Sequence, residues 1–216
     1  GKRYLLLPIE EKAGEAKLYM ISNNDVIKTI NIRLAINKVD YFVPLDLSAY
    51  EAKNLGFNIQ LVPDSALCWR EMKLSDTFDS SNREKYRPKY HFSPAYGWMN
   101  DPNGMVYKDG EYHLFYQYNP YGSMWGNMHW GHAISKDLIT WTHQPVAIAP
   151  DGLGTIFSGS CVIDKNNTAG FGANAIIAFY TSAGERQSQS MAYSLDNGRT
   201  FKKYERNPIL TSTVRD

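Results

Sequence analysis

The second half of the chain contains a sequence repeat. The segment HAISKDLITW at 132–141, followed by Pro145, matches MAYSLDNGRTF at 191–201, followed by Pro208, with one residue inserted in the second copy. A repeat with a period of about 60 residues, made of short strands and turns, is typical of β-propeller blades. Each blade is a four-stranded sheet that must pack against its neighbours, so the repeat predicts an all-β fold.

Turn chemistry supports this interpretation. The run 108–111 (KDGE) lies between MVY and YHLFYQY, and Asp-Gly between two apolar runs is a strong hairpin signal. The second copy of the repeat contains Ser194, Asp196 and Gly198, where the Asp side chain can bond the backbone ahead of it. We interpret both segments as structural turns.

The first part of the chain has a different pattern. Short runs rich in β-branched and aromatic residues alternate with turn clusters, which predicts a small antiparallel β-sandwich. The predicted strands are 17–22, 26–36, 41–47, 57–62 and 67–74. We therefore predict a β-sandwich module at 1–75, a polar linker at 76–89, and the first two propeller blades with the start of a third at 90–216.

Three polar residues recur at the blade period. Asp101, Ser158 and Asp216 are 57 and 58 residues apart. The innermost strands of a propeller line a central channel, so residues that open successive strands can converge at one end of it. The spacing predicts that the three side chains share a pocket.

Composition narrows the partners. Lys and Arg number 23 against 22 Asp and Glu, so the totals contain no electrostatic footprint for nucleic acid or for an anionic membrane. The chain has no apolar run of 18 residues, and we predict no membrane span. The 15 Tyr, 9 Phe and 5 Trp suit stacking against sugar rings. Cys68 and Cys161 lack metal or redox spacing, and we predict buried structural thiols.

Several motifs resemble glycoside hydrolase family 32, which contains invertases, inulinases and levanases. They are WMNDPNG (98–104), YQYNP (116–120), WGNMHWGHAISKDLITW (125–141), FSGS (157–160) and the final Arg215-Asp216. The resemblance covers about 90–216, and the predicted N-terminal sandwich contributes little to it. It implies a five-bladed propeller, of which this chain supplies only the first part.

The resemblance also implies site roles. Asp101 would be the nucleophile that attacks the anomeric carbon of a fructosyl unit, and Asn100 would orient the sugar. Asp216 would hold ring hydroxyls and stabilise the transition state, with Arg215 keeping its carboxylate ionised. Because Pro102 lacks an N–H and Asn-Gly follows it, we expect Asp101 to lie on a constrained turn.

The remaining predicted contacts form a sugar pocket. Gln117 and Ser158 can bond hydroxyls, whereas Trp125 and Phe157 can form the apolar wall that the resemblance implies, and Trp98 can extend it. We expect no metal and no cofactor, because His129 and His132 lack the pattern of a zinc site. These histidines are expected to satisfy hydrogen bonds within the first blade.

Retaining hydrolysis also needs a general acid/base. In the family this is a Glu in a Glu-Cys motif, which this chain lacks; Glu185 and Glu205 are poor substitutes because they lie on the wrong predicted strands. We therefore expect an incomplete portion of an enzyme, inactive alone, with the rest of the propeller in the same or another chain.

The predicted function is retaining hydrolysis of β-fructosyl linkages in levan, inulin or sucrose. A fructosyltransferase and a non-catalytic fructan- or carbohydrate-binding protein remain as alternatives. The substrate class favours a secreted, periplasmic or cell-surface protein. Linkage preference, endo or exo cleavage, oligomeric state and the role of residues 1–75 stay open.

Overall fold

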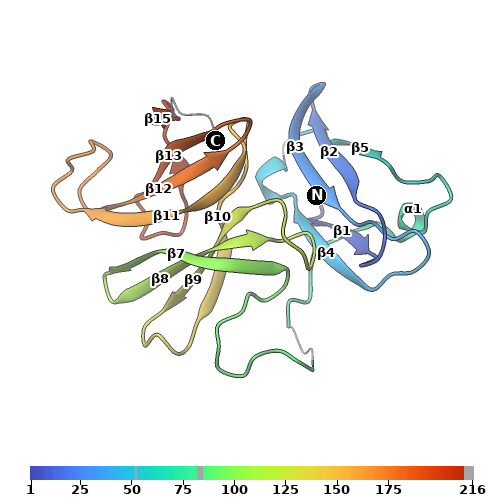
Figure 1. Ribbon diagram of the computed structural model, residues 1–216, viewed down its shortest axis with the longest axis horizontal. Coiled ribbons are helices and arrows are strands. Elements are labelled where there is room, and N and C mark those ends of the chain that lie inside the picture. The colour runs from blue at the N-terminus through green and yellow to red at the C-terminus, as the bar shows by residue number, and fades with distance from the viewer. Residues whose placement is uncertain (52, 82–84, 212–216) are drawn as a thin grey trace. The chain divides into compact units, whose positions relative to one another are not determined.

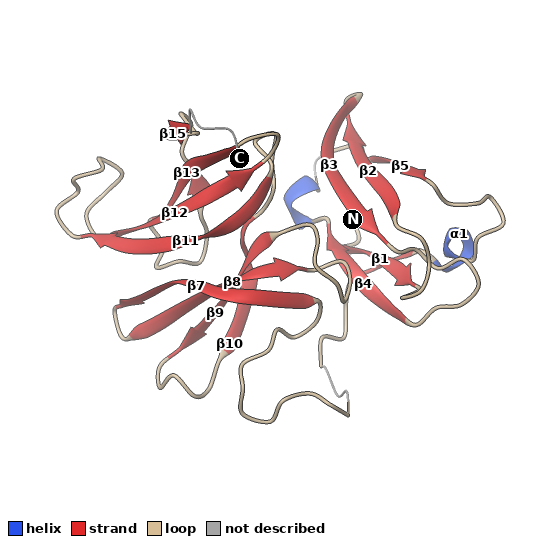
Figure 2. Cartoon of the chain, viewed as in Figure 1, coloured by secondary structure: helices blue, strands red, loops and turns tan. Residues whose placement is uncertain are grey.

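The protein is almost entirely β-structure (Figures 1 and 2). The computed structural model describes residues 1–51, 53–81 and 85–211. Its residues group into two compact units. Unit 1 comprises Gly1–Lys85, Ala95–Trp98 and Asn119–Asn127, and unit 2 comprises Tyr86–Pro94, Met99–Tyr118 and the chain from Met128 onward. The all-β prediction is confirmed.

Most of unit 1 is a β-sandwich of two three-stranded antiparallel sheets, in the orders β4-β1-β6 and β3-β2-β5. The strands are β1 Tyr4–Ile9, β2 Ala16–Ser22, β3 Asp25–Ile32, β4 Tyr41–Asp46, β5 Gly56–Gln60 and β6 Lys73–Ser75. Two short helices, η1 Ser48–Tyr50 and α1 Cys68–Glu71, lie in the connections. The predicted sandwich is therefore present.

Alternating side chains of both sheets meet in one core. On β2, Ala16, Leu18 and Met20 are buried while the residues between them are more exposed, as expected for a strand with one face against a core. Partners from the other strands complete the cluster, which includes Leu7, Ile9, Ile30, Ile32, Val43 and Leu45.

Two features of unit 1 differ from the prediction. No strand was predicted at β1, which is the central strand of its sheet. The strand predicted at 67–74 is wrong for most of its length, because it begins with helix α1. The backbone N–H groups of Leu67 and Cys68 donate to Ile36 and Ala35 carbonyls at 2.9 and 2.8 Å, and these bonds to the neighbouring loop fix a helical turn there.

Unit 2 begins with a four-stranded antiparallel sheet in the order β10-β9-β8-β7, which we call blade one. Its strands are β7 Trp98–Lys108, β8 Glu111–Asn119, β9 His129–Ser135 and β10 Thr142–Ile148. The predicted Asp-Gly hairpin is confirmed: Asp109 and Gly110 have φ of 49° and 83°, the left-handed pair of a tight hairpin. β9 is buried along its whole length, as expected for a strand covered on both faces.

The second sheet, blade two, has the order β11-β12-β13-β14, with β15 also paired to β13. Its strands are β11 Thr155–Asp164, β12 Ala175–Ala183, β13 Gln187–Ser194, β14 Lys202–Lys203 and β15 Leu210–Thr211. Phe115 and Trp130 of blade one share a buried cluster with Ile156, Ala178 and Tyr180 of blade two. The two sheets therefore pack as neighbouring blades.

The sequence repeat corresponds to one structural motif. In blade one the third strand ends at Ser135, and Asp137 accepts the backbone N–H of Thr140 at 2.7 Å. In blade two the third strand ends at Ser194, and Asp196 accepts the backbone N–H of Thr200 at 2.9 Å. In both copies the serine hydroxyl also bonds the aspartate. The predicted turn at 194–201 is therefore confirmed, and it recurs in blade one.

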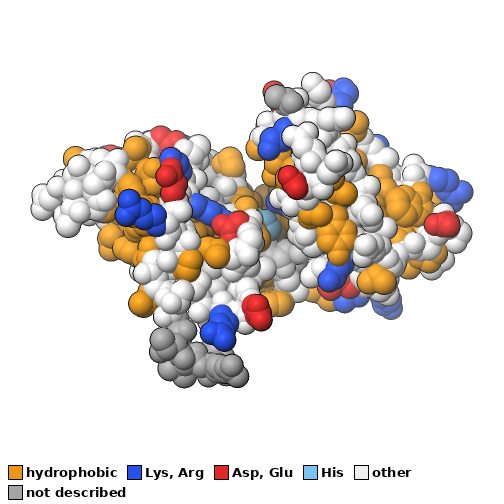
Figure 3. All heavy atoms as spheres, turned by 90° about the horizontal axis from the view of Figure 1, so that it is seen from above, with side chains coloured by type: hydrophobic (Ala, Val, Ile, Leu, Met, Phe, Trp, Pro, Cys, Tyr) orange, Lys and Arg blue, Asp and Glu red, His pale blue; other side chains and the backbone are white. Residues whose placement is uncertain are grey.

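The surface contains no large field of one charge on the face drawn in Figure 3, where basic and acidic side chains are interspersed. This agrees with the nearly balanced charges of the chain. The boundaries at 75/76 and 89/90 stay predictions, and the start of the third blade at Asp216 lies outside the described residues.

Candidate active site

Asp101 and Ser158 occupy equivalent places in the two blades. Each is the fourth residue of the first strand of its blade, since β7 begins at Trp98 and β11 at Thr155. Their side chains meet: the Ser158 hydroxyl donates to Asp101 Oδ2 at 3.0 Å. The convergence that the spacing predicts is therefore observed for this pair. Asp216, the third member, lies outside the described residues.

A β-bulge aims Ser158. On β11, Phe157 pairs with Thr181 and Gly159 pairs with Tyr180, so Ser158 is an extra residue without a partner on β12. Bulges redirect one side chain and are frequent beside active sites. Gly159 makes the bulge possible, because a Cβ at that position would lie 1.9 Å from the Phe179 carbonyl oxygen.

The segment around Asp101 differs from the predicted turn. Residues 101–104 lie inside β7, an edge strand of blade one. An edge strand tolerates the proline at 102, because it has a neighbouring strand on one side only. Only Gly104 has a left-handed φ, of 59°. A Cβ there would lie 3.0 Å from the Trp130 ring and 3.2 Å from Cys161 Sγ, so the strand passes directly over the core.

Asn100 and Asn103 flank the carboxylate. Asn103 Nδ2 donates to the Asp101 carbonyl oxygen at 3.2 Å, which supports the local backbone. Asn100 Oδ1 is buried, and no hydrogen-bond donor reaches it from the part of the chain that the structure describes. A buried polar atom without a partner calls for an explanation, and a ligand that binds there is one.

Gln117 and Phe157 contribute to the joint between the blades. Gln117 is buried, and its Nε2 donates to the Ile156 carbonyl at 2.8 Å. Trp130 Nε1 donates to the Phe157 carbonyl at 3.0 Å. These bonds from blade one fix the start of β11, at the two residues that precede Ser158. One amide hydrogen of Gln117 is therefore used in a bond between the blades. The sequence did not suggest this structural role.

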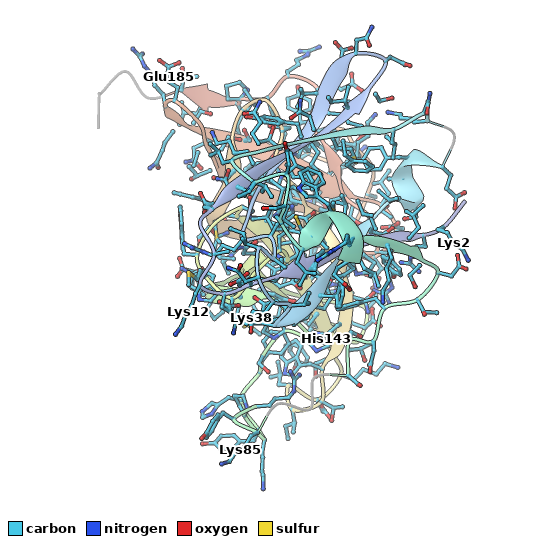
Figure 4. All side chains as sticks on the ribbon, turned by 90° about the vertical axis from the view of Figure 1, so that its right-hand side faces the viewer. Lys2, Lys12, Lys38, Lys85, His143 and Glu185 are labelled. Carbon is cyan, nitrogen blue, oxygen red and sulfur yellow. The ribbon has the colours of Figure 1, made fainter. Side chains whose placement is uncertain are left out.

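The two predicted tryptophans of the sugar wall group with unit 1. Trp98, at the start of β7, is half-buried, and Trp125, in the loop between β8 and β9, is 60% exposed. Arg215 lies outside the described residues, as Asp216 does. Glu185 lies in the turn between β12 and β13 and is labelled near the upper edge of the view in Figure 4.

Sequence reasoning missed the residues that support the site. Gly104 and Gly159 lie in the strands that carry Asp101 and Ser158, and Trp130 binds the backbone of β11. A signal existed for Gly159, since an isolated glycine inside a strand pattern suggests a bulge. Nothing in the sequence marks Trp130 as the donor to Phe157.

The histidines of blade one form a buried structural pair. His113 Nδ1 and His132 Nε2 are 3.1 Å apart, so the hydrogen bond expected for His132 is confirmed. Burial lowers the pKa of His132 to about 3 and also lowers the pKa of His113. Both rings are therefore neutral at pH 7. Among residues 1–51, 53–81 and 85–211 no three His, Cys, Asp or Glu side chains gather as a metal site would require.

The thiols differ in their surroundings. Cys68 and Cys161 are both free; Cys68 is fully buried, whereas Cys161 is partly exposed. Desolvation raises the pKa of both thiols. In the described ranges no helix is long and apolar enough to cross a membrane.

Comparison with known proteins decides the family. Residues 91–216 match the model of the glycosyl hydrolases family 32 N-terminal domain. The chain belongs to glycosyl hydrolases family 32. Residues 1–90 match a second model, described only as a domain of unknown function (DUF4980). The family predicted from the motifs is confirmed.

Similar proteins of this family include a levanase of Bacillus subtilis (strain 168), 62% identical over 141 residues, which are 63% of this chain and 21% of the levanase. An extracellular exo-inulinase of Aspergillus awamori is 46% identical over 162 residues, covering 64% of this chain and 30% of the inulinase. The chain therefore spans less than a third of the length of either relative.

Solved structures agree. The crystal structure of the Aspergillus awamori exo-inulinase has a TM-score of 0.56 at 46% identity, covering 62% of this chain and 30% of that one. A β-fructofuranosidase from Schwanniomyces occidentalis complexed with fructosyl-erythritol has a TM-score of 0.56 at 45% identity, covering 62% and 28%. These family 32 structures support the fold class of the described blades.

Proposed function

We propose that this chain carries the nucleophile part of a retaining family 32 active site, which cleaves β-fructosyl linkages through a fructosyl-enzyme intermediate. The observation that carries the proposal is the hydrogen bond from Ser158 to Asp101 between equivalent positions of two blades. Two strands from different blades that converge on one carboxylate are what a preorganised nucleophile requires.

In the proposed first step an Asp101 carboxylate oxygen forms a bond to the anomeric carbon of the fructosyl unit. The bond from that carbon to the departing oxygen breaks at the same time, and an acid group protonates this oxygen. That acid, the family Glu, belongs to the remainder of the propeller. Water then attacks the anomeric carbon, releases Asp101 and gives its proton to the same group.

Neighbouring groups suit this role. Ser158 donates to Oδ2 of Asp101, so this bond fixes one carboxylate oxygen and the other oxygen is the better candidate for attack. Asn100 Oδ1, buried without a donor in the described chain, would accept a sugar hydroxyl. A site built to bond a hydroxyl discriminates strongly against sugars that lack it.

The other proposed contacts are those that the sequence predicts. Phe157, Trp125 and Trp98 would pack against the apolar face of the sugar ring. Gln117, Asp216 and Arg215 would complete the polar contacts. For Gln117 this leaves its second amide hydrogen and its oxygen, since the first hydrogen bonds Ile156.

The substrate class is proposed to be a fructose-containing oligo- or polysaccharide, with levan, inulin and sucrose as candidates. The names of the relatives support this, since they include a levanase and an exo-inulinase. The description "extracellular" of the exo-inulinase supports a proposal that this protein too acts outside the cytoplasm. We also propose the module boundaries predicted above.

The test uses the full-length protein that contains this chain. We expect it to release reducing sugar from at least one of levan, inulin and sucrose, and we expect Asp101→Asn to reduce kcat by a factor of about 10³ or more. Asp109→Asn is the matched control, because Asp109 lies in an exposed hairpin turn and should leave kcat unchanged.

Chemical rescue separates a nucleophile from a residue that only binds. In Asp101→Ala, azide can enter the vacated position and form a fructosyl azide, which wild-type protein should not accumulate. An Asp101→Asn protein as active as the wild type would contradict the proposal. Binding of fructans without cleavage by the full-length wild type would favour the carbohydrate-binding alternative.

A further inference from the structure

The loop between β8 and β9, residues 119–127, belongs to unit 1 although both strands that it joins belong mainly to blade one. We call it the Trp125 loop. Trp125 itself is 60% exposed, and the backbone of the loop fixes where its side chain begins. The contacts that hold the backbone of the loop therefore determine where Trp125 lies.

The first anchor is Asn127, which binds the backbone of strand β3. Its Oδ1 accepts the N–H of Asn31 at 2.9 Å, and its Nδ2 donates to the Asn31 carbonyl oxygen at 2.8 Å. The side-chain amide thus replaces a peptide group of a neighbouring strand. Both partners are backbone atoms, so the contact depends on the sandwich being folded.

The second anchor is Ser123, on the other side of Trp125. Its hydroxyl donates to Glu11 Oε2 at 2.6 Å, and the hydroxyl of Tyr41 donates to the other oxygen of the same carboxylate. Glu11 therefore links the loop to strand β4. Trp125 lies midway between the two anchors, two residues from each.

The third anchor is Tyr121, whose ring enters the sandwich core. It is 6% exposed and belongs to the same cluster as Leu18 and Ile30. The Lys28 ammonium lies 5.6 Å from the centroid of its ring, within the range of a cation–π contact. Burial of an aromatic side chain of this size stabilises the folded loop by more free energy than any single hydrogen bond in it.

Bonds inside the loop join these anchors. Asn119 Nδ2 donates to the Met124 carbonyl oxygen at 2.9 Å. Asn119 Oδ1 accepts the N–H of Tyr121 at 3.0 Å and Asn127 Nδ2 at 3.2 Å. The carbonyl next to Trp125 is therefore bonded to Asn119, which in turn bonds Asn127 at the other end of the loop.

We propose that the N-terminal sandwich, which matches a domain of unknown function, positions the Trp125 loop for substrate binding. The proposal rests on the proposed function, in which Trp125 forms part of the sugar wall. A loop that is ordered before the sugar arrives does not lose its freedom on binding, so the sandwich raises affinity without touching the reacting atoms. Asn127 is then a positioning residue.

The decisive variant is Asn127→Gly. Asn127 has a φ of 42°, a left-handed conformation that glycine adopts without strain, so this change removes the amide and keeps the backbone. In the full-length protein we expect KM for the cleaved fructan to rise about tenfold, with kcat within about twofold of wild type. Amide hydrogens of 121–127 should exchange faster.

Asn24→Gly is the matched control. Asn24 is exposed, lies in the turn between β2 and β3 of the same unit, and has a φ of 68°. It should leave KM and the exchange of 121–127 unchanged. Asn127→Asp keeps the acceptor for the Asn31 N–H but places a carboxylate oxygen against the Asn31 carbonyl oxygen, so its KM should also rise above that of the wild type.

The outcomes separate the two proposals. Faster exchange of the loop in Asn127→Gly with an unchanged KM would overturn the positioning role, and so would unchanged exchange. Retention of full activity by Asp101→Asn would instead overturn the catalytic proposal. If the wild type cleaves none of the fructans, the same variants are compared by calorimetry for their Kd toward a short levan oligosaccharide, and equal Kd values would overturn the positioning role.

Discussion

The two blades share one plan but present different chemistry. Their third strands end in the same Ser-x-Asp turn, and their first strands carry Asp101 and Ser158 at the same place. Blade one presents a carboxylate from an edge strand with a proline, whereas blade two presents a hydroxyl from a bulge. The repeated backbone decides which side chains meet, and local irregularities decide how each is aimed.

The largest effect on stability is expected for a variant in the β-bulge of blade two. Gly159→Ala would place a Cβ 1.9 Å from a backbone carbonyl oxygen, which cannot move without breaking the β11–β12 ladder. We expect a loss of unfolding free energy of about 3 kcal/mol. Thermal unfolding measures it, with Gly152→Ala as control because a Cβ there meets nothing within 4 Å.

A glycine in β9 of blade one, Gly131, should be more tolerant. A Cβ on Gly131 would lie 2.2 Å from the Tyr116 ring, which is a side chain and can be shortened. We therefore expect Gly131→Ala to be destabilising alone and to recover in part when combined with Tyr116→Leu. Equal instability of the single and double variants would show that the blade one contact is as rigid as the one at Gly159.

At acid pH we expect blade one to lose more stability than blade two. All five histidines precede residue 144, and none lies in blade two. Burial lowers the pKa of His132 to about 3, below its value of about 6.5 in an unfolded chain. The unfolded state then binds more protons, so stability is full above about pH 6.5 and falls as the pH drops toward 3. At pH 5 the loss is about 2 kcal/mol.

Hydrogen exchange locates this loss. Between pH 7 and pH 5, after correction for the intrinsic rate, amides of β8 and β9 should lose more protection than those of β12 and β13. His132→Gln removes the titrating group and should flatten the pH dependence. Equal loss in both blades would contradict the assignment to the His113–His132 pair.

Much of the fold followed from the sequence, because periodic signals are local. The repeat at 132–141 and 191–201 predicted the blades, and its turns form from side chains and backbone only a few residues apart. The error at 67–74 arose because its helix is fixed by bonds to Ala35 and Ile36, which are distant in sequence.

The candidate site was only partly predictable for the same reason. The spacing of 57 residues was enough to bring Ser158 to Asp101. It could not reveal the bulge, which is defined by the register with β12, or the bond of Gln117 to Ile156 on the next blade. Both depend on a partner strand that the local pattern does not contain.

Ser158→Ala is expected to have an intermediate effect, on kcat/KM. It removes the hydroxyl that blade two donates to the carboxylate of blade one, and a hydrogen bond to a charged group is worth about 1.5–3 kcal/mol. We expect kcat/KM for the fructan substrate to fall about tenfold or more. Ser160→Ala, at an exposed position two residues along the strand, is the control and should leave kcat/KM unchanged.

The smallest expected effect is in the ion pair that links the blades. Arg199 Nη2 donates to both oxygens of Glu111, at 3.0 and 2.9 Å, but its side chain is 44% exposed. Because solvent screens such a pair, we expect Arg199→Ala to lower the unfolding free energy by about 0.5–1 kcal/mol. Denaturant unfolding at low and high salt checks this, and the difference from wild type should shrink in high salt.

The amide of Asn127 has a consequence beyond the loop. Strand β3 lies at the edge of its sheet, and such edges offer free N–H and C=O groups to any other extended chain. At Asn31 both groups are already bonded to Asn127. A single side chain thus closes one site at which a foreign strand would dock, and the protein is protected there against edge-to-edge association.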